Sequence, residues 1–132
     1  MQKGEVVYCP HYTFPDGGVD DKLIINLNEP ASGEPNLFLL TTAQPKTKLK
    51  TPGCFSNRGY YVIQKNLDFF LAEFTWVLFW TLTEFSLVEE LREAWKGNFK
   101  TMGILRPETV AAIINCLRDS NYINTQQVSL LR

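Results

Sequence analysis

Residues 37–42 read LFLLTT, and this stretch decides the predicted fold. A run of four apolar residues followed by two threonines favours a strand that is buried on both faces. A strand of that kind lies in the centre of a sheet rather than at its edge. We therefore expect Leu37 to Thr42 to form a central strand, with further strands on either side.

Four other stretches have the β-prone composition and the flanking turn residues of strands. They are Glu5–Tyr8, Lys22–Leu27, Gly59–Gln64 and Thr75–Leu82. Pro10 and Pro15 are expected to interrupt the chain after the first of them, and Asp16-Gly17-Gly18 marks a turn. Residues 44–57 are expected to form a long basic loop. Short strands separated by turn signals predict a small, strongly curved antiparallel sheet or SH3-like barrel.

Helices are predicted only towards the C-terminus, so the expected fold class is mainly β with α. Ser86 and Glu89 have the spacing of a capping box, and the helix that they begin would run to about Trp95. A second helix would begin at Pro107, a favoured first position, and end near Asp119 or Ser120. Its buried face would consist of residues at helical spacing, namely Val110, Ile113, Ile114 and Leu117.

Size and hydropathy restrict the class and location of the chain. Its 132 residues are enough for one domain with a substantial core, so we treat residues 1–132 as a single domain. No stretch reaches the roughly 18 consecutive apolar residues of a membrane-spanning helix. The opening residues, MQKGEVVYCP, lack the apolar region of a signal peptide. Both observations favour the cytoplasm and no membrane partner.

The cysteines are too widely spaced to suggest a familiar site. Cys9, Cys54 and Cys116 are the three cysteines, and His11 is the one histidine. Cys9 and His11 lie close together, but the remaining spacings match no standard zinc site. A disulfide framework is not expected in a cytosolic chain. We therefore predict buried free thiols, no metal and no cofactor.

Positive charge is concentrated in one part of the chain. Residues 35–67 contain no acidic residue, whereas the whole chain has a formal net charge of −1. The five basic residues of this segment are Lys46, Lys48, Lys50, Arg58 and Lys65. Such a segment can attract a polyanion at one place on the molecule. The alternative is a solvated loop that keeps the neighbouring strand edges soluble.

A series of short landmarks, in order along most of the chain, resembles the PemK/MazF family of bacterial toxins. They are residues 3–7 (KGEVV), the Gly17-Gly18 loop with residues 21–26 (DKLIIN), residues 39–42 (LLTT), residues 103–108 (GILRPE) and the Val110–Leu117 helix. The resemblance implies an SH3-like barrel that cleaves single-stranded RNA without a metal. It also implies a homodimer and an antitoxin protein as partners.

The resemblance further implies which residues carry the reaction. The family's catalytic arginine falls at Lys22, and Leu23 replaces the proline that follows it. The family's threonine falls at Thr42, with Thr41 beside it. An arginine offers a planar, bidentate fork to a phosphate, whereas a lysine offers a point charge. Because of the departure at Lys22, the resemblance supports the fold more than it supports cleavage.

The residues themselves offer the chemistry that metal-free RNA cleavage needs. The reaction requires a base, a cation for the crowded phosphorane and an acid for the leaving oxygen. Asp20 or Asp21 beside Lys22 can supply the base and the phosphate clamp, and the alternative is an exposed ion pair at a hairpin end. We expect Asp21, Lys22 and Thr42 nearest the scissile phosphate. RNA would be bound by Thr41, Lys46, Lys48 and Lys50.

Two further residues are candidates for the same site. His11 is the one side chain that ordinarily changes charge near neutral pH, and it lies in the same first loop; the alternative is a solvated loop histidine. Arg58 could replace the missing arginine in space, or it could pair with Asp68 or Glu73. Thr42 could instead bond to nearby backbone at the end of its strand.

Aromatic residues cluster around the basic segment. Rings among basic residues suit stacking on unpaired bases, and core packing is the alternative. The rings are those of Tyr60, Tyr61, Phe69, Phe70, Phe74 and Trp76. Residues 69–71 (FFL), if exposed, would be a dimer or antitoxin surface. The leading hypothesis is a PemK/MazF-like endoribonuclease. The alternatives are a non-catalytic RNA- or protein-binding module that lost the catalytic arginine, and a domain that binds only proteins.

Overall fold

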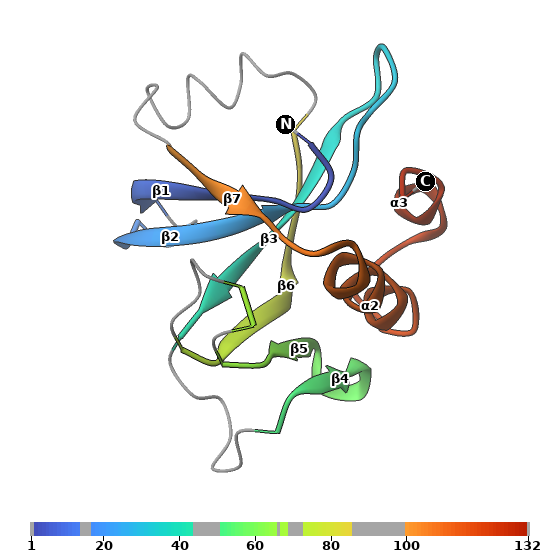
Figure 1. Ribbon diagram of the computed structural model, residues 1–132. Coiled ribbons are helices and arrows are strands. Elements are labelled where there is room, and N and C mark those ends of the chain that lie inside the picture. The colour runs from blue at the N-terminus through green and yellow to red at the C-terminus, as the bar shows by residue number, and fades with distance from the viewer. Residues whose placement is uncertain are drawn as a thin grey trace.

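Seven strands pair into one antiparallel sheet (Figure 1). The computed structural model describes residues 2–13, 17–43, 51–65, 67–68, 73–85 and 100–131. The strand order across the sheet is β4-β5-β6-β3-β2-β1-β7. The strands are β1 (Glu5–Thr13), β2 (Val19–Asn26), β3 (Asn36–Thr42), β4 (Gly53–Phe55), β5 (Tyr60–Ile63), β6 (Thr75–Phe85) and β7 (Lys100–Ile104).

The central position predicted for residues 37–42 is confirmed. β3 pairs with β2 on one side and with β6 on the other, and six of its seven residues are buried. Leu37 and Leu39 belong to the main core, and Phe38 and Leu40 are buried as well. Successive side chains of a strand point to opposite faces, so β3 is covered on both faces.

The predicted class, mainly β with α, is also confirmed. β4 and β7 lie at the two ends of the sheet. Closure into a barrel would require these two strands to pair, and the ladders of the described residues contain no such pairing. The described strands therefore do not confirm closure, and barrel closure stays a prediction.

The expected interruption at Pro10 is wrong, because β1 continues through it to Thr13. Proline has no N–H to donate to a ladder, so it is tolerated in strands at edges and bulges. The β1–β2 register shifts between Cys9 and Tyr12, which is where Pro10 lies. The irregularity lets the strand pass its proline and resume pairing at Tyr12 with Asp20.

The two end strands were not predicted. β4 lies within the segment expected to be a basic loop and has only three residues, which pair with β5. β7 pairs with β1, and its burial pattern is almost entirely exposed. A short or exposed strand shows neither an apolar run nor a clear alternation, so its sequence resembles that of a loop.

Buried asparagines hold the connection between β2 and β3. Asn26, Asn28 and Asn36 are at most 5% exposed. The Asn26 amide donates to the Gln2 and Asn28 carbonyls at 2.9 and 2.6 Å, and its oxygen accepts from Asn36 Nδ2 at 3.1 Å. Asn28 donates to the Pro35 carbonyl and accepts from the Leu37 N–H. Buried polar groups need such partners, so this network fixes how the chain enters β3.

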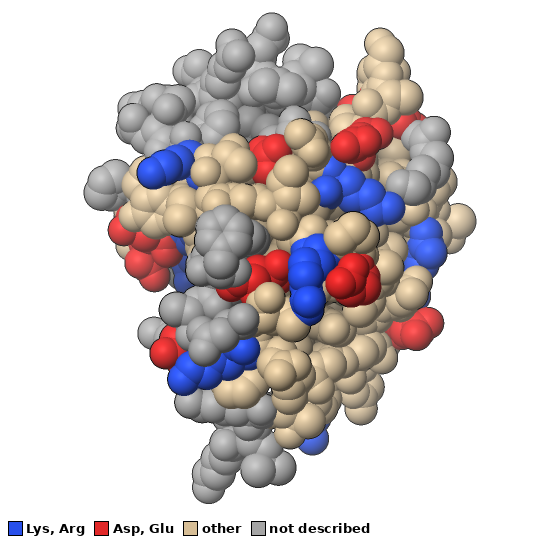
Figure 2. Space-filling view, in the orientation of Figure 1, with Lys and Arg blue, Asp and Glu red and all other residues tan. Residues whose placement is uncertain are grey.

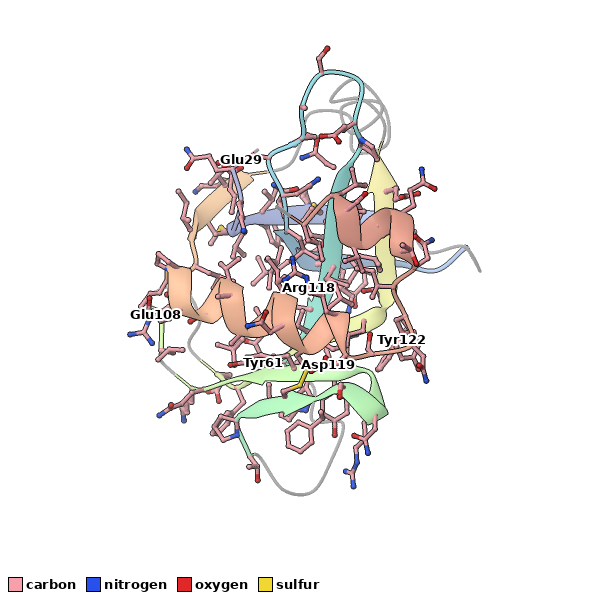
Figure 3. All side chains as sticks on the ribbon, turned by 90° about the vertical axis from the view of Figure 1, so that its right-hand side faces the viewer. Glu29, Tyr61, Glu108, Arg118, Asp119 and Tyr122 are labelled. Atoms are coloured by element: carbon pink, nitrogen blue, oxygen red, sulfur yellow. A yellow bond between two sulfur atoms is a disulfide. The ribbon has the colours of Figure 1, made fainter. Side chains whose placement is uncertain are left out.

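Helix α2 (Pro107–Arg118) covers one face of the sheet (Figure 3). It begins at Pro107 as predicted, and the predicted apolar residues at helical spacing are its buried face. These side chains pack in one core with Ile25, Leu39, Val77 and Phe79 of the sheet. The short helix α3 (Thr125–Ser129) has a capping box formed by Asn124 and Gln127. Neither described helix is long and apolar enough to span a membrane. The predicted Ser86–Trp95 helix lies outside the described residues.

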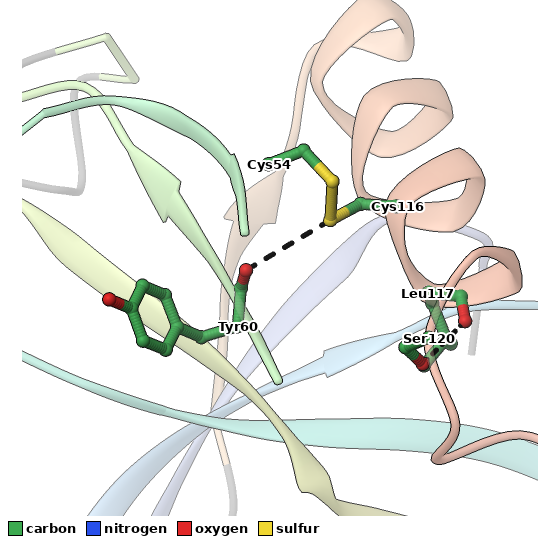
Figure 4. The surroundings of a disulfide bond; sticks show 5 residues. All are labelled: Cys54, Tyr60, Cys116, Leu117 and Ser120. Carbon is green, nitrogen blue, oxygen red and sulfur yellow. Dashed lines mark hydrogen bonds between the residues drawn. A yellow bond between two sulfur atoms is a disulfide. The ribbon is translucent and has the colours of Figure 1, made fainter. Parts of the chain in front are cut away.

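A disulfide joins Cys54 of β4 to Cys116 of α2, so the expectation of three free thiols is wrong (Figure 4). Their Cα atoms are 5.5 Å apart although 62 positions separate them in sequence. Sequence spacing cannot show that an end strand of the sheet lies against a helix near the C-terminus. Cys9 is the free, buried cysteine, as predicted. Burial raises the pKa of its thiol to about 12.

Candidate functional site

An open pocket of about 500 Å3 lies where β2 begins and β3 ends. It is lined by Asp20, Asp21, Lys22, Leu23, Thr41, Thr42 and Ala43. Four of the predicted site residues, Asp21, Lys22, Thr41 and Thr42, therefore meet at one place. The pocket is the candidate functional site.

The antiparallel pairing of β2 with β3 explains this meeting. Ile24 pairs with Leu40 and Ile25 with Leu39. Continuing that register by two residues sets Lys22 opposite Thr42. The Thr41 hydroxyl donates to the Leu23 carbonyl at 2.8 Å, which agrees with this placement. The start of one strand and the end of the next thus supply the lysine and the threonines.

Lys22 is partly covered and faces a carboxylate. Its Nζ lies 3.8 Å from Asp20 Oδ2, and the two side chains are 19% and 66% exposed. Residues two apart in a strand share a face, so Asp20 and not Asp21 lies on the lysine's side of β2. An ion pair with so exposed an acid contributes little to stability. A phosphate could therefore replace Asp20 at the ammonium group at small cost.

Asp21 has a different partner, the hydroxyl of Tyr8. Tyr8 Oη donates to Asp21 Oδ2 at 2.8 Å. The hydrogen bond to this carboxylate, followed by desolvation and the carboxylate's charge, raises the pKa of the Tyr8 phenol. Sequence reasoning missed Tyr8, because the contact depends on the β1–β2 register in which Tyr8 pairs with Leu23. The hydrogen bond orients one of the two carboxylates of the pocket.

Beyond Thr42, the same row of the sheet leads to buried aromatic residues. Thr42 pairs with Trp76, and Trp76 pairs with Val62. Trp76 and Tyr60 pack in a small cluster with Val62 and Leu78 and are 1% and 5% exposed. These two rings are therefore core residues, as the alternative to base stacking predicted. The Trp76 Nε1 and the Tyr60 hydroxyl have no hydrogen-bond partner among the described residues.

The other predicted site residues do not line the pocket, or they lie outside the residues that the structure describes. The backbone of His11 lies in β1, in the register shift between the partners of Lys22 and Asp20. Arg58 is exposed in the 3-10 helix η1 (Ser56–Arg58), and it is not among the residues that line the pocket. Glu73, a possible partner of Arg58, lies 3.8 Å from Lys65. Lys46, Lys48 and Lys50 and residues 69–71 lie outside the described residues.

The charge of the pocket comes from one lysine and two aspartates, so its described side chains sum to −1. On the face shown in Figure 2, basic and acidic side chains lie next to one another. Within the described ranges, no group of three or more His, Cys, Asp or Glu residues is arranged to hold a metal ion. Comparisons of the chain with family models, curated proteins and solved structures found no match.

Proposed function

We propose that the protein is a PemK/MazF-like toxin, an endoribonuclease that cleaves single-stranded RNA without a metal. One observation carries the proposal: an open pocket gathers Lys22, Thr42 and two carboxylates from the start of β2 and the end of β3. The resemblance to the family implies Lys22 and Thr42 as site residues, and both of them line this pocket. Lys46, Lys48 and Lys50, which lie outside the described residues, follow Ala43 of the pocket lining by only a few positions in the sequence, and a polyanion such as RNA suits this local positive charge.

The proposed reaction is an attack by the 2′-hydroxyl on the neighbouring phosphorus. Asp20, which lies on the lysine's side of β2, takes the 2′-hydroxyl proton in place of the predicted Asp21, whose carboxylate accepts from the Tyr8 hydroxyl. The O2′–P bond forms while the P–O5′ bond breaks, and the leaving O5′ takes a proton from water. Lys22 stabilises the charge that develops on the phosphorane oxygens, and the Thr42 hydroxyl donates to one of them. The products are a 2′,3′-cyclic phosphate and a 5′-hydroxyl.

The second candidate function is a non-catalytic RNA- or protein-binding module on the same sheet. Two observations favour it over an enzyme: a lysine stands where the resemblance implies an arginine, and the carboxylates outnumber the cation in the pocket. A lysine neutralises a phosphate without the bidentate geometry that fits a phosphorane. Binding without turnover is the outcome that this candidate predicts.

The location and partners proposed for the toxin follow from its substrate. Messenger RNA is cytoplasmic, so we propose a cytoplasmic location, a homodimer and an antitoxin protein. The Cys54–Cys116 disulfide is typical of oxidising compartments. In a reducing cytoplasm, the proposed toxin would hold these two cysteines as thiols. Measuring the mass of the purified protein in solution tests the homodimer.

A cleavage assay tests the proposed function. The purified protein is incubated with a long single-stranded RNA in EDTA, beside Lys22→Ala, Lys22→Arg and the control Lys100→Ala. Lys100 is an exposed lysine of β7 outside the pocket. We expect cleavage by the wild type and by Lys100→Ala, a loss of at least about 100-fold in Lys22→Ala, and retained cleavage in Lys22→Arg. Cleavage that is equal in Lys22→Ala would show that this pocket is not the active site.

If RNA is bound but never cleaved, the binding module replaces the enzyme. Binding must then weaken steeply as the salt concentration rises, because phosphate contacts release counterions. The absence of both cleavage and binding would leave only the protein-interaction hypothesis.

A further inference from the structure

Two large aromatic side chains remain half exposed next to one another on the folded protein. Trp80 of β6 and Tyr122, which follows α2, are 49% and 45% exposed. Their ring centroids are 6.5 Å apart, and the ring planes are inclined by 59°. Figure 3 shows Tyr122 beyond the end of α2. We call Trp80 and Tyr122 the aromatic pair.

Backbone contacts hold the aromatic pair in place. The Phe79 N–H donates to the Gly59 carbonyl at 2.8 Å, which fixes Trp80 relative to the turn before β5. Gly59 has a φ of +83°, and a Cβ on it would lie 2.7 Å from Tyr122 Cε2. Only glycine permits both that backbone conformation and that approach of the Tyr122 ring. On the other side, the Tyr122 N–H donates to the Ser120 hydroxyl at 3.2 Å.

An exposed cation, Arg58, directly precedes Gly59 in the sequence. Gly59 contacts the surroundings of both rings, because its carbonyl accepts from the Phe79 N–H next to Trp80 and a Cβ on it would meet the Tyr122 ring. The backbone of Arg58 is therefore one residue from the turn that holds the aromatic pair. Arg58 was predicted for the catalytic site, but it is not among the residues that line the pocket. Exposed rings with an arginine close by are a combination that suits unpaired nucleotides.

The size of the surface favours a nucleobase over a protein. Two half-exposed aromatic side chains present about 200 Å2 of surface, whereas a stable protein interface buries about 800 Å2 on each partner. The other exposed large apolar residues among those described, Val19, Met102 and Ile104, belong to β2 and β7, away from the β4–β5 end of the sheet. Arg58, which precedes Gly59, and Asp119, three residues before Tyr122, are exposed and charged. A small, rigid aromatic surface with charged residues close by in the chain fits one stacked base.

We propose that Trp80 and Tyr122, together with Arg58, form a stacking site for an unpaired base of single-stranded RNA. The base stacks on the indole, and Arg58 contacts a phosphate next to it. The proposal rests on the RNA substrate of the proposed function but not on cleavage. Thr42 of the pocket pairs with Trp76, and Trp80 is four residues further along β6, in the part where the pairing with β3 is irregular. Four residues span at most about 14 Å. A short RNA strand can therefore reach both sites.

The test is binding of a 2′-O-methyl oligonucleotide of about ten residues, a length within the usual range of single-strand sites. This probe cannot be cleaved by 2′-hydroxyl attack, so binding is measured apart from catalysis. Fluorescence anisotropy of the end-labelled probe gives the affinity for the wild type, Trp80→Ala, Trp80→Phe and the control Met102→Ala. Met102 is 37% exposed on β7, far from the pair in strand order. Thermal unfolding of each variant checks that the fold is unchanged.

We expect Trp80→Ala to weaken binding about tenfold or more, because stacking of one base is lost. Trp80→Phe should retain part of the affinity, and Met102→Ala should bind as the wild type does. Arg58→Gln should reduce the slope of log affinity against log salt by about 0.7. Asp119→Asn should tighten binding, since it removes an anion near the phosphate.

Equal affinities of the wild type and Trp80→Ala would overturn the proposal, and so would the absence of any binding to the probe. If Trp80→Ala changed only the oligomeric state, the pair would be a protein contact and the proposal would be wrong. If RNA is cleaved but binding of the probe does not depend on Trp80, the stacking site is rejected and the proposed function stands. If binding depends on Trp80 but unmodified RNA is not cleaved, the stacking site stands and the proposed endoribonuclease function is rejected.

Discussion

Reducing the Cys54–Cys116 disulfide should destabilise the protein by about 4 kcal/mol at 25 °C. The bond closes a loop of 62 residues, and loop-closure entropy for about that length amounts to about 14 cal/mol/K. Two features of the native state keep the other contributions of reduction to the free energy of unfolding small. Cys54 is exposed, so its thiol can be hydrated. Cys116 Sγ lies 3.9 Å from the Tyr60 carbonyl, an acceptor for the buried thiol that reduction creates (Figure 4).

Urea unfolding followed by tryptophan fluorescence measures the effect. With a slope of about 2 kcal/mol per molar urea, typical of small domains, the unfolding midpoint should fall by about 2 M in reductant. Cys54→Ser should show the same low midpoint with and without reductant. Cys9→Ala should behave as the wild type does, because Cys9 takes no part in the bond.

Coincident unfolding curves of the wild type with and without reductant would refute this reasoning. Mass spectrometry of alkylated protein must first show that the bond is present in one sample and absent from the other. A midpoint that fell in reductant for Cys54→Ser as well would assign the effect to the reductant rather than to the loop.

Three other changes probe contacts described above. Asn26→Ala should cost about 2–4 kcal/mol in urea unfolding, because it removes buried hydrogen bonds and leaves Asn36 Nδ2 without its acceptor; exposed Asn57→Ala is the control, and equal stability of the two variants would count against the network. Gly59→Ala should lower stability by about 1–2 kcal/mol or more, since φ is +83° and the new Cβ meets Tyr122; a calorimetric Tm equal to that of the wild type would contradict this. The wild type should lose stability as pH rises from about 9 towards 12. Burial raises the pKa of the Cys9 thiol to about 12, so this thiol stays protonated in the folded protein while it ionises in the unfolded chain. The free energy of unfolding should fall by at most about 1.4 kcal/mol per pH unit, and it should fall less steeply in Cys9→Ala; equal pH dependence of the two proteins would exclude Cys9 as the cause.

Elements with a strong periodic signal could be predicted from the sequence. β3 has an uninterrupted apolar run, and α2 has Pro107 at its start and a regular apolar face, so each was located to within about two residues. The strand through Pro10 was truncated in the prediction, because a proline normally ends a strand and the bulge that accommodates it depends on pairing with β2. β4 is too short to show any pattern.

The residues of the candidate site that lie on neighbouring strands could be predicted from the sequence. The contacts that depend on tertiary structure could not. Lys22 and Thr42 follow from the landmarks at the ends of two consecutive strands. The Tyr8–Asp21 hydrogen bond depends on register, and the distance from Arg58 to the pocket depends on the turn before β5. The disulfide joins residues whose proximity is decided by how α2 packs on the sheet. None of these has a local signal in the sequence.

The covalent loop between Cys54 and Cys116 also determines how the chain would respond to a mechanical load. A force applied at the two termini passes through the disulfide and bypasses the 62 positions between its cysteines. β5, β6 and β7 and most of α2 lie within that bypassed segment, whereas β1, β2 and β3 carry the tension. At about 3.5 Å per residue, the hidden length is about 220 Å of a total of about 460 Å. A single oxidised molecule would therefore extend about half as far as a reduced one.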